Sequence, residues 1–335
     1  MKGTRARLRD VAEAAGVSAA TASRVLSGKS NVSSTAREAV LAASTRLNYR
    51  GDPIARALRT QRTGMVGMLV PDISNPFFAE LIEALSRVLQ EAGIDLLLAD
   101  SHGSILQEAR WLVSLPERRV DALLVVPAHH QLSLPALAEA AKLVPVIQLD
   151  RRVDQLQADW TAVDNVRGMT LLMEHLVTVG VRSVALINGS DVSSSGQTRR
   201  LAFEAAIAAQ PGLTVIGEQG GDFTTTFGRW AVRELTARGQ LPDAIVCGSD
   251  MIALGALTEL RVQGLQVPRD VKLTGFDGIG LTELTEPAIT TVVQPLAAIA
   301  SEARRLLELR VEGVQGPPQL KELEPRLRLR ASSRK

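Results

Sequence analysis

Residues 8–26 read LRDVAEAAGVSAATASRVL, and this stretch predicts two short helices joined by a tight turn. In the first helix, apolar residues recur at helical spacing and would bury one face, namely Leu8, Val11, Ala12 and Ala15. Gly16 is the residue type expected where that helix ends with a positive φ. Ser18 would then cap a second helix from about residue 19 to residue 27.

The second predicted helix combines small residues with one protruding arginine. Ala22, Val25 and Leu26 face inward, whereas Thr21 and Arg24 lie three residues apart on or beside the outer face. A helix, a turn with glycine and a second helix of this size form the layout of a helix-turn-helix, whose second helix enters the DNA major groove. Arg24 can bind O6 and N7 of guanine through its two-pronged donor geometry. The competing interpretation is a helical hairpin with a solvated arginine.

The charge of the chain is unevenly distributed. Of its 335 residues, the first 62 contain 12 Lys and Arg against 4 Asp and Glu, whereas the rest contain 26 against 32. A small basic segment on a mildly acidic body indicates that the N-terminal segment alone meets a polyanion. The alternative, a solvated basic tail, is disfavoured by the helical periodicity within it.

Two further helices are predicted before residue 63. Ser33 would cap a third helix whose inner face is formed by Val40, Leu41, Ser44 and Leu47. Residues 52–60, DPIARALRT, begin with Asp at a cap position and Pro at the first helical position, but give only about two turns. Because so short a helix is marginal alone in water, we expect it to form only when it packs or docks on DNA. A fixed linker helix is the alternative.

From Thr63 onward, apolar strand-like runs alternate with amphipathic helices. Residues 65–72, MVGMLVPD, and residues 94–100 are predicted to be strands buried on both faces. This alternation predicts parallel sheets with helices on both faces, and its length requires two sheets. Residues 193–196, SSSG, are expected to form a polar loop between a strand and a helix.

Polar residues follow many of the predicted strands. They include Asp72, Asn75, Asp100, His102, Asp150, Arg151, Asp164, Asn165, Asn188, Ser190, Ser249, Asp250 and Asp277. Because ligands of open parallel sheets bind beyond the carboxyl ends of the strands, we expect these residues to outline a cleft between two lobes. Such a cleft suits a polyhydroxylated ligand. Asp250 could instead serve as the cap of the helix that follows it.

Patterns typical of enzymes and cofactor sites are missing. The sequence has no phosphate-binding GxxxxGK[ST] loop, no GxGxxG fingerprint and no nucleophile-elbow pattern. Four His and one Cys supply no spaced metal set, so we predict no enzyme activity, no cofactor and no metal. A single cysteine, Cys247, and the lack of a signal peptide or a membrane-length apolar run predict a cytoplasmic protein.

The chain resembles transcriptional regulators of the LacI/GalR family over nearly its whole length. The strongest stretch is DVAEAAGVSAATASRVLSG at residues 10–28. Further motifs follow in the family's order: SNPFFAELI at 74–82, VDNVRG at 163–168, CGSDMIALGAL at 247–257, GFDGI at 275–279 and TTVVQP at 290–295.

The resemblance implies a fold and a domain order. Residues 1–50 would form an all-α helix-turn-helix headpiece and residues 51–63 a hinge helix and linker. Residues 64–335 would form an effector-binding and dimerisation α/β core of the periplasmic-binding-protein type, with two parallel-sheet, Rossmann-like lobes. The N-lobe would span about 64–162 and 294–321, and the C-lobe about 163–293 and 322–335.

The resemblance also implies DNA-binding residues. They are Arg9, Ser18, Ala19, Ala20, Thr21, Arg24, Asn31, Tyr49, Ala55, Leu58 and Arg59. Ala19 and Ala20 stand where the family has its main specificity side chains, and their methyl groups can touch a thymine methyl but cannot form hydrogen bonds. Leu58 would wedge into the minor groove at the operator centre, with Arg59 beside it in the narrowed groove.

Effector-binding residues are implied in the core. They are Asn75, Phe77, Asp150, Arg199, Phe223, Ser249, Asp277 and Gln294. Arg199 begins the pattern Arg-x-x-Gly-Phe, with Ala202 in place of Gly, and the adjacent Arg200 leaves the assignment open by one residue.

The expected function is that of a sequence-specific transcriptional regulator, most simply a repressor. Its partners would be near-palindromic operator DNA in the bacterial nucleoid, a second copy of the chain in a homodimer or tetramer, and a small effector. A sugar or sugar derivative is expected as the effector, and a purine or nucleoside corepressor is the alternative. A solute-binding transport protein is a more remote alternative, which the basic N-terminal segment opposes.

Overall fold

The computed structural model describes residues 6–26, 32–49, 62–239 and 241–334. The chain divides into two compact units, residues 1–63 and residues 64–335, and each is described by itself. The predicted hinge helix of residues 52–60 lies outside the described residues.

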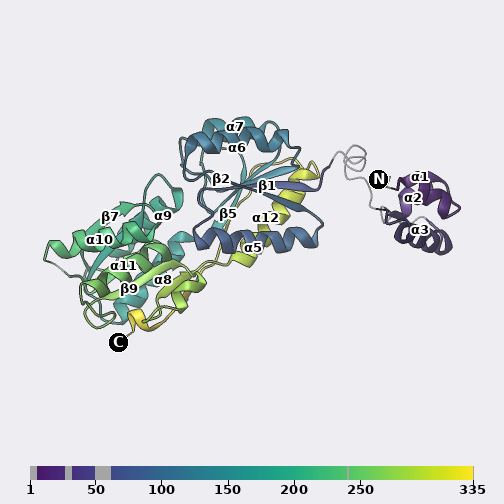
Figure 1. The fold of residues 1–335 in the computed structure, drawn as a ribbon. Coiled ribbons are helices and arrows are strands. Elements are labelled where there is room, and N and C mark those ends of the chain that lie inside the picture. Colours follow the sequence, from purple (N-terminus) through teal and green to yellow (C-terminus); the bar gives the residue numbers. More distant parts are fainter. Residues whose placement is uncertain (1–5, 27–31, 50–61, 240, 335) are drawn as a thin grey trace. The chain divides into compact units, whose positions relative to one another are not determined.

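In the described residues of the first unit, the headpiece, there are three helices: α1 (Leu8–Ala14), α2 (Ala19–Leu26) and α3 (Ser34–Arg46) (Figure 1). Gly16 has φ 66°, as predicted for the turn between α1 and α2. The Ser18 hydroxyl accepts the Thr21 N–H at 3.1 Å, and the Ser33 hydroxyl accepts the Ala36 N–H at 3.3 Å. Both predicted caps are therefore confirmed.

The headpiece core consists of small apolar side chains from the three helices: Val11, Ala12, Ala22, Val25, Val40 and Ala43. The predicted inner faces of α1 and α2 are confirmed. The prediction that Leu41 faces inward is wrong, because its side chain is 50% exposed and Ala43 takes the inward position. Ala43 follows Val40 by three residues, most of a helical turn, and so lies on the same face of the helix. Leu41 follows Val40 by one residue and points about 100° away.

The second unit, the core, contains two sheets. The first sheet holds β1 (Met65–Val70), β2 (Asp95–Asp100), β3 (Ala122–Val125), β4 (Val146–Leu149), β5 (Asp159–Val163) and β11 (Leu320–Leu323). Its strand order is β11-β5-β4-β3-β1-β2, and all pairs are parallel. Helices α5 (Pro76–Glu91) and α12 (Leu296–Val311) pack on one face, and α6 (Ile105–Glu117) and α7 (Leu134–Ala141) on the other (Figure 1). We call this layer structure the first lobe.

The second sheet holds β6 (Ser183–Gly189), β7 (Thr214–Gly221), β8 (Ala244–Cys247), β9 (Lys272–Asp277), β10 (Thr290–Val293) and β12 (Arg326–Arg328). Its order is β12-β10-β9-β8-β6-β7, and β12 pairs antiparallel with β10. One face is covered by α8 (Asn165–Thr178) and α9 (Ser194–Ala208), the other by α10 (Thr225–Ala237) and α11 (Asp250–Val262). This second lobe thus departs from the expected all-parallel sheet only at its edge strand β12.

Two local predictions are corrected by the structure. Residues 94–100 are not buried on both faces, because β2 lies at the edge of its sheet and pairs only with β1. Residues 194–196 are not loop, because α9 begins at Ser194. The Ser193 hydroxyl caps that helix by accepting the Gly196 N–H at 2.9 Å.

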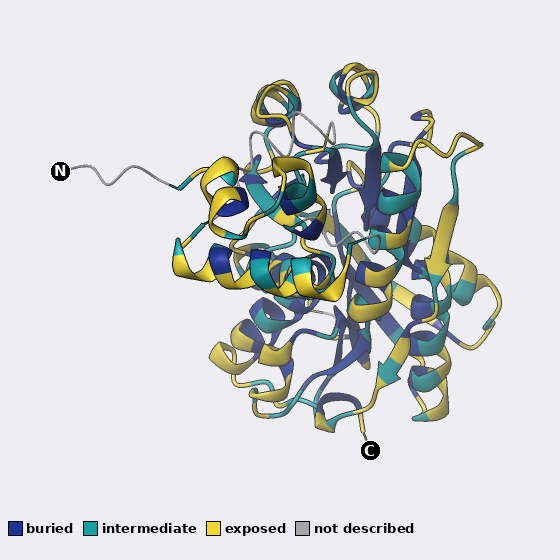
Figure 2. Cartoon of the chain, turned by 90° about the vertical axis from the view of Figure 1, so that its right-hand side faces the viewer, coloured by how far each residue is buried: buried dark blue, intermediate teal, exposed yellow. Residues whose placement is uncertain are grey.

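Burial follows the layers of each lobe: the central strands are buried, the edge strands β2, β7, β11 and β12 are mostly half-buried or exposed, and the helices are exposed on their outer sides (Figure 2). Among the described residues, no helix has both the length and the apolar character that crossing a bilayer requires. Two short 3-10 helices complete the second lobe, Gly280–Glu283 and Ala331–Ser333.

Candidate functional site

The exposed face of α2 in the headpiece carries few side chains that can form hydrogen bonds. Ala19, Ala20 and Arg24 are exposed on this helix, and Arg9 is exposed on α1. Thr21 is half-buried, and its hydroxyl lies 2.9 Å from that of Ser18. Of the three exposed side chains of α2, Arg24 is therefore the only one that can donate hydrogen bonds, because the other two are the methyl groups of Ala19 and Ala20.

The other predicted DNA-binding residues divide into two groups. Tyr49 is half-buried and packs against the headpiece core, so much of its ring supports the bundle. Four predicted residues lie outside the described part of the chain: Asn31, Ala55, Leu58 and Arg59.

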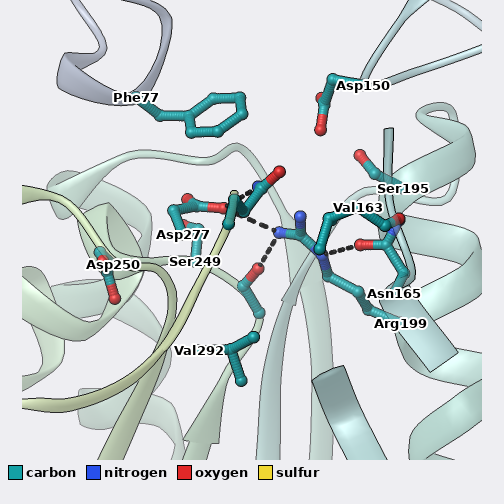
Figure 3. Close-up of polar contacts among 12 residues, drawn as sticks. Phe77, Asp150, Val163, Asn165, Ser195, Arg199, Ser249, Asp250, Asp277 and Val292 are labelled. Carbon is teal, nitrogen blue, oxygen red and sulfur yellow. Dashed lines mark hydrogen bonds and ion pairs between the residues drawn. The ribbon is translucent and has the colours of Figure 1, made fainter. Parts of the chain in front are cut away.

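In the core, Arg199 is the centre of a buried polar network (Figure 3). Its Nε donates to Asn165 Oδ1 at 2.7 Å, and its Nη1 donates to the Gly248 carbonyl at 2.7 Å and to Asp277 Oδ1 at 3.3 Å. The guanidinium carbon lies 3.7 Å from the centroid of the Phe276 ring. Only 3% of the side chain is exposed, so α9, α8 and the ends of β8 and β9 together fix its position.

Arg200 lies in a different environment. It is partly exposed at the surface of α9, where it pairs with Asp191 and Glu204. The structure thus brings Arg199, and not Arg200, to the other predicted effector residues.

Asp277 receives donors from two directions. Besides Arg199, the Gln294 side-chain amide donates to Asp277 Oδ1 at 2.9 Å. The backbone of Asp277 has φ 121°, a conformation that is costly for any residue other than glycine and that clusters at functional sites. Burial raises the pKa of Asp277 to about 6, opposed by Arg199 and reinforced by Asp150.

Asp150 comes from the first lobe and points toward the same space as Arg199 (Figure 3). It also has a positive φ, 56°, and its carboxylate is buried. Burial raises its pKa, and Arg199 opposes that shift. Asp150 Oδ1 has no hydrogen-bond partner in the described part of the chain.

The remaining predicted effector residues have mixed roles. Phe77 is buried and faces the Arg199 network (Figure 3). Phe223 lies directly over Gly189, where a Cβ would come within 1.9 Å of its ring. The side chains of Asn75 and Ser249 cap α5 and α11, accepting the N–H groups of Phe77 and Ile252.

Arg151 is a site residue that the sequence singled out only as polar and following a strand. Its guanidinium carbon lies 5.8 Å from the Phe78 ring centroid of the first lobe and 5.2 Å from the Phe223 centroid of the second. Its Nε is buried and without a hydrogen-bond partner among the described residues. Asn165, which orients Arg199, was likewise recognised only by its place after a strand.

The two lobes touch directly around this network. The Ser194 hydroxyl accepts the Arg152 N–H at 2.9 Å, and the Val192 carbonyl accepts the His130 N–H at 2.9 Å. A third contact joins Glu80 Oε1 of α5 to the Gly280 N–H at 3.0 Å. The network therefore lies between two lobes that are closed on each other.

The chemistry of the network is that of recognition. Two arginines, two aspartates and two amides supply both donors and acceptors, and phenylalanine rings provide apolar faces, a combination that binds hydroxyl-rich molecules. Among the described residues, no group of three His, Cys, Asp or Glu side chains could hold a metal ion. Cys247 is buried in the second lobe, and this burial raises the pKa of its thiol, which makes it unreactive.

Two protein families match parts of the chain. Residues 7–52 match bacterial regulatory proteins of the lacI family, and residues 173–333 match the periplasmic binding protein-like domain. The ribose operon repressor of Halalkalibacterium halodurans is 34% identical over 91% of this chain and 90% of its own length. The transcriptional repressor PurR of Pectobacterium carotovorum is 32% identical over 96% of this chain and 95% of its own length. The crystal structure of the lac repressor dimer bound to operator and an anti-inducer superposes with a TM-score of 0.86 at 25% identity, covering 99% of this chain and all of the other.

Proposed function

The chain belongs to the LacI family of bacterial regulatory proteins, and from this premise we propose that a sugar bound between its core lobes sets its affinity for operator DNA. The protein is a DNA-binding transcriptional regulator with a ligand-binding core and not an enzyme. The proposal concerns the effector, the residues that bind it and the way in which effector binding changes DNA binding.

The observation that carries the proposal is a set of buried polar atoms in the Arg199 network that have no hydrogen-bond partner, although one of them, Arg151 Nε, lies 3.8 Å from Asp150 Oδ2 in an ion pair. Asp150 Oδ1, Arg151 Nε and Gln294 Oε1 are all buried, and none has a hydrogen-bond partner in the described part of the chain. Leaving such groups unpaired costs about 1–3 kcal/mol each, so a ligand that pairs with them gains that free energy. Two acceptors beside one donor fit hydroxyl groups, which both donate and accept.

The charge balance favours a neutral ligand. Asp150 and Asp277 carry two negative charges, and Arg151 and Arg199 carry two positive charges, so the network has no excess charge to offer a phosphate or an ammonium group. Phe77 and Phe223 can cover the apolar face of a sugar ring. The relative that represses a ribose operon makes D-ribose the first compound to test.

At the DNA, the exposed face of α2 offers few side chains that can form hydrogen bonds with bases. Each headpiece of a homodimer would bind one half of a near-palindromic operator, with Arg24 as its main base-specific donor. Leu58 would insert into the minor groove between the half-sites, so L58G should abolish tight specific binding while the effector still binds. Undiminished operator affinity of that variant would refute the wedge.

Effector and operator would be coupled through the first lobe. The Gly64 N–H, where the core begins, donates to Asp121 Oδ2 at 2.7 Å, which fixes the attachment point of the hinge on the sheet. Rotation of the lobes on each other would change the spacing of the two attachment points in a dimer. A coupling free energy of about 1–3 kcal/mol would change operator affinity about 5- to 150-fold.

A thermal-shift screen of sugars, nucleosides and purines tests the ligand class. We expect D-ribose or a related sugar to raise the melting temperature of the wild-type protein, with no shift in the R199A variant. Stabilisation by a purine alone would replace the sugar by the corepressor alternative. A gel shift on DNA from upstream of its own gene tests the operator, and sedimentation velocity tests the dimer against the tetramer.

A further inference from the structure

Asp250 is a buried carboxylate whose role differs from the helix cap that its sequence position allows. It is the first residue of α11 and is fully buried, but the cap of that helix is the Ser249 hydroxyl. The Asp250 side chain instead crosses to the segment that follows β9. A substitution of Gly275 by any larger residue would collide with this carboxylate, because a Cβ there would lie 2.2 Å from Asp250 Oδ1.

Three donors converge on the Asp250 carboxylate. Oδ2 accepts the N–H groups of Gly278 at 2.7 Å and Ile279 at 2.8 Å. Oδ1 accepts the Thr291 hydroxyl of β10 at 2.6 Å. All three partners lie far along the chain from Asp250, so the carboxylate joins the start of α11 to β10 and to the segment that follows β9.

The two backbone groups that Asp250 holds come immediately after the effector residue Asp277. The positive φ of Asp277, 121°, is strained, and Gly278 continues the unusual path with φ 80°. Such conformations persist only where surrounding interactions over-determine them. The two short hydrogen bonds to Asp250 supply that constraint directly next to the strained residue.

The same segment then enters the first lobe. Ile279 is 1% exposed and belongs to the hydrophobic cluster formed by α5, α12 and the first sheet. The next residue, Gly280, donates its N–H to Glu80 Oε1 of α5 at 3.0 Å. Four consecutive residues, 277–280, thus run from the Arg199 network of the second lobe into the core of the first.

We propose that Asp250 is the positioning residue of this connection. It holds Asp277 in the conformation that binds the effector, and it places Ile279 and Gly280 against α5. Ligand binding in the second lobe therefore changes the contacts that this segment makes with the first lobe. The proposal rests on the proposed function, because it assigns Asp277 to the effector site. Asp250 itself does not contact the effector.

Hydrogen–deuterium exchange on the full-length protein tests the positioning without any ligand. In D250A, the two backbone N–H groups of residues 278 and 279 lose their common acceptor, so we expect faster exchange at both. If Asp250 positions the connection, exchange at Gly280, whose partner Glu80 is intact, also accelerates at least about tenfold. Unchanged protection of Gly280 would overturn the proposal.

Two further variants separate positioning from loss of structure. E80A removes only the first-lobe partner and should accelerate exchange at Gly280 while residues 278 and 279 stay protected. T291V removes one donor to Asp250 at nearly constant volume and should give a weaker form of the D250A pattern. If D250A does not fold, T291V decides: accelerated exchange at residue 280 supports the proposal, and wild-type exchange there contradicts it.

A ligand arm uses D-ribose as the probe. In wild type, saturating ribose should slow exchange at Gly280, and in D250A the ribose midpoint should rise at least about tenfold. An unchanged ribose midpoint in folded D250A would overturn the proposal. If wild type itself does not bind ribose, the sugar assignment fails, and the exchange at residue 280 without ligand still decides the role of Asp250.

Discussion

Arg199 and Arg200 are adjacent in the sequence, yet α9 turns one toward the interior and the other toward solvent. Arg199 binds Asn165, Asp277 and the Gly248 carbonyl with 3% of its side chain exposed. Arg200 has 27% of its side chain exposed and pairs with surface carboxylates. The sequence pattern did not distinguish which of the two arginines belongs to the effector network. The rotation of about 100° per residue along the helix turns only Arg199 inward.

The two arginines therefore provide a matched pair of substitutions. R199A leaves Asn165 and Asp277 buried without their charged partner, so we expect effector affinity to fall about a hundredfold or more. R200A removes only surface ion pairs and should change effector affinity by less than about fivefold. Isothermal titration of D-ribose measures both, and equal losses in the two variants would contradict the assignment.

We expect the proposed effector site to depend on pH through Asp277. Burial raises its pKa to about 6, so its carboxylate takes up a proton as pH falls through that value and then accepts hydroxyl protons and the Arg199 N–H less well. We expect ribose affinity to fall severalfold between about pH 7.5 and about pH 5.5. The residual affinity of D277N should be nearly independent of pH. A pH profile of D277N like that of wild type would assign the titration to another group.

We propose that Arg24 carries the base recognition of the headpiece, because the other exposed side chains of α2 are the methyl groups of Ala19 and Ala20. R24A should weaken operator binding by about 1–3 kcal/mol and reduce the preference for guanine at the contacted position. Fluorescence anisotropy with the operator and with single-base variants measures both effects. An even loss across all sequences would instead make Arg24 a phosphate contact.

At the scale of helices and strands, local patterns predicted most of the fold. The caps at Ser18 and Ser33 and the buried strand β1 follow from residue types a few positions apart, and the structure confirms them. The start of α9 was missed because any of three consecutive serines could end the loop, and only the hydrogen bond from the Gly196 N–H selects Ser193.

The site was less predictable, because its partners are distant in sequence. Asp250 was expected as a possible cap, but its partners lie 28, 29 and 41 residues further along the chain. The place of Arg151 between Phe78 and Phe223 depends on how the two lobes meet, which no local pattern contains. Spacing alone predicts the polar edge of a sheet but not which of its members turn inward.

Helix α12 is tied to the first sheet by an ion pair between the partly buried Arg310 and the buried Asp159. Arg310 Nε and Nη2 donate to the two carboxylate oxygens of Asp159 on β5 at 2.7 and 2.8 Å, and the same guanidinium donates to the carbonyls of Val314 and Pro317. Because Asp159 is 2% exposed, removing Arg310 leaves a buried charge without its partner.

We expect R310A to lower the free energy of unfolding of the core by about 3 kcal/mol. The control is R305A on the same helix, which breaks a more exposed pair with Glu302 and should cost less than about 1 kcal/mol. Urea denaturation followed by circular dichroism measures both. A loss for R310A no larger than that for R305A would show that the ion pair is not what holds α12.

At the scale of the whole molecule, the effector network and the contacts between the lobes are built from the same segments. Ser194 begins the helix that carries Arg199 and also accepts the Arg152 N–H from the other lobe. Residues 277–280 carry Asp277 and also reach α5. We therefore expect a ligand that pairs with Asp150 and Arg199 to act on groups from both lobes and to bias how the lobes close.

The most direct test is the operator affinity of the full-length protein, measured by fluorescence anisotropy with and without saturating D-ribose, in wild type and in R199A. The account predicts that ribose changes the wild-type Kd about 5- to 150-fold and leaves that of R199A unchanged, with both proteins binding the operator equally without ribose. An equal response to ribose in the two proteins, or a wild-type operator affinity that no sugar alters, would contradict it.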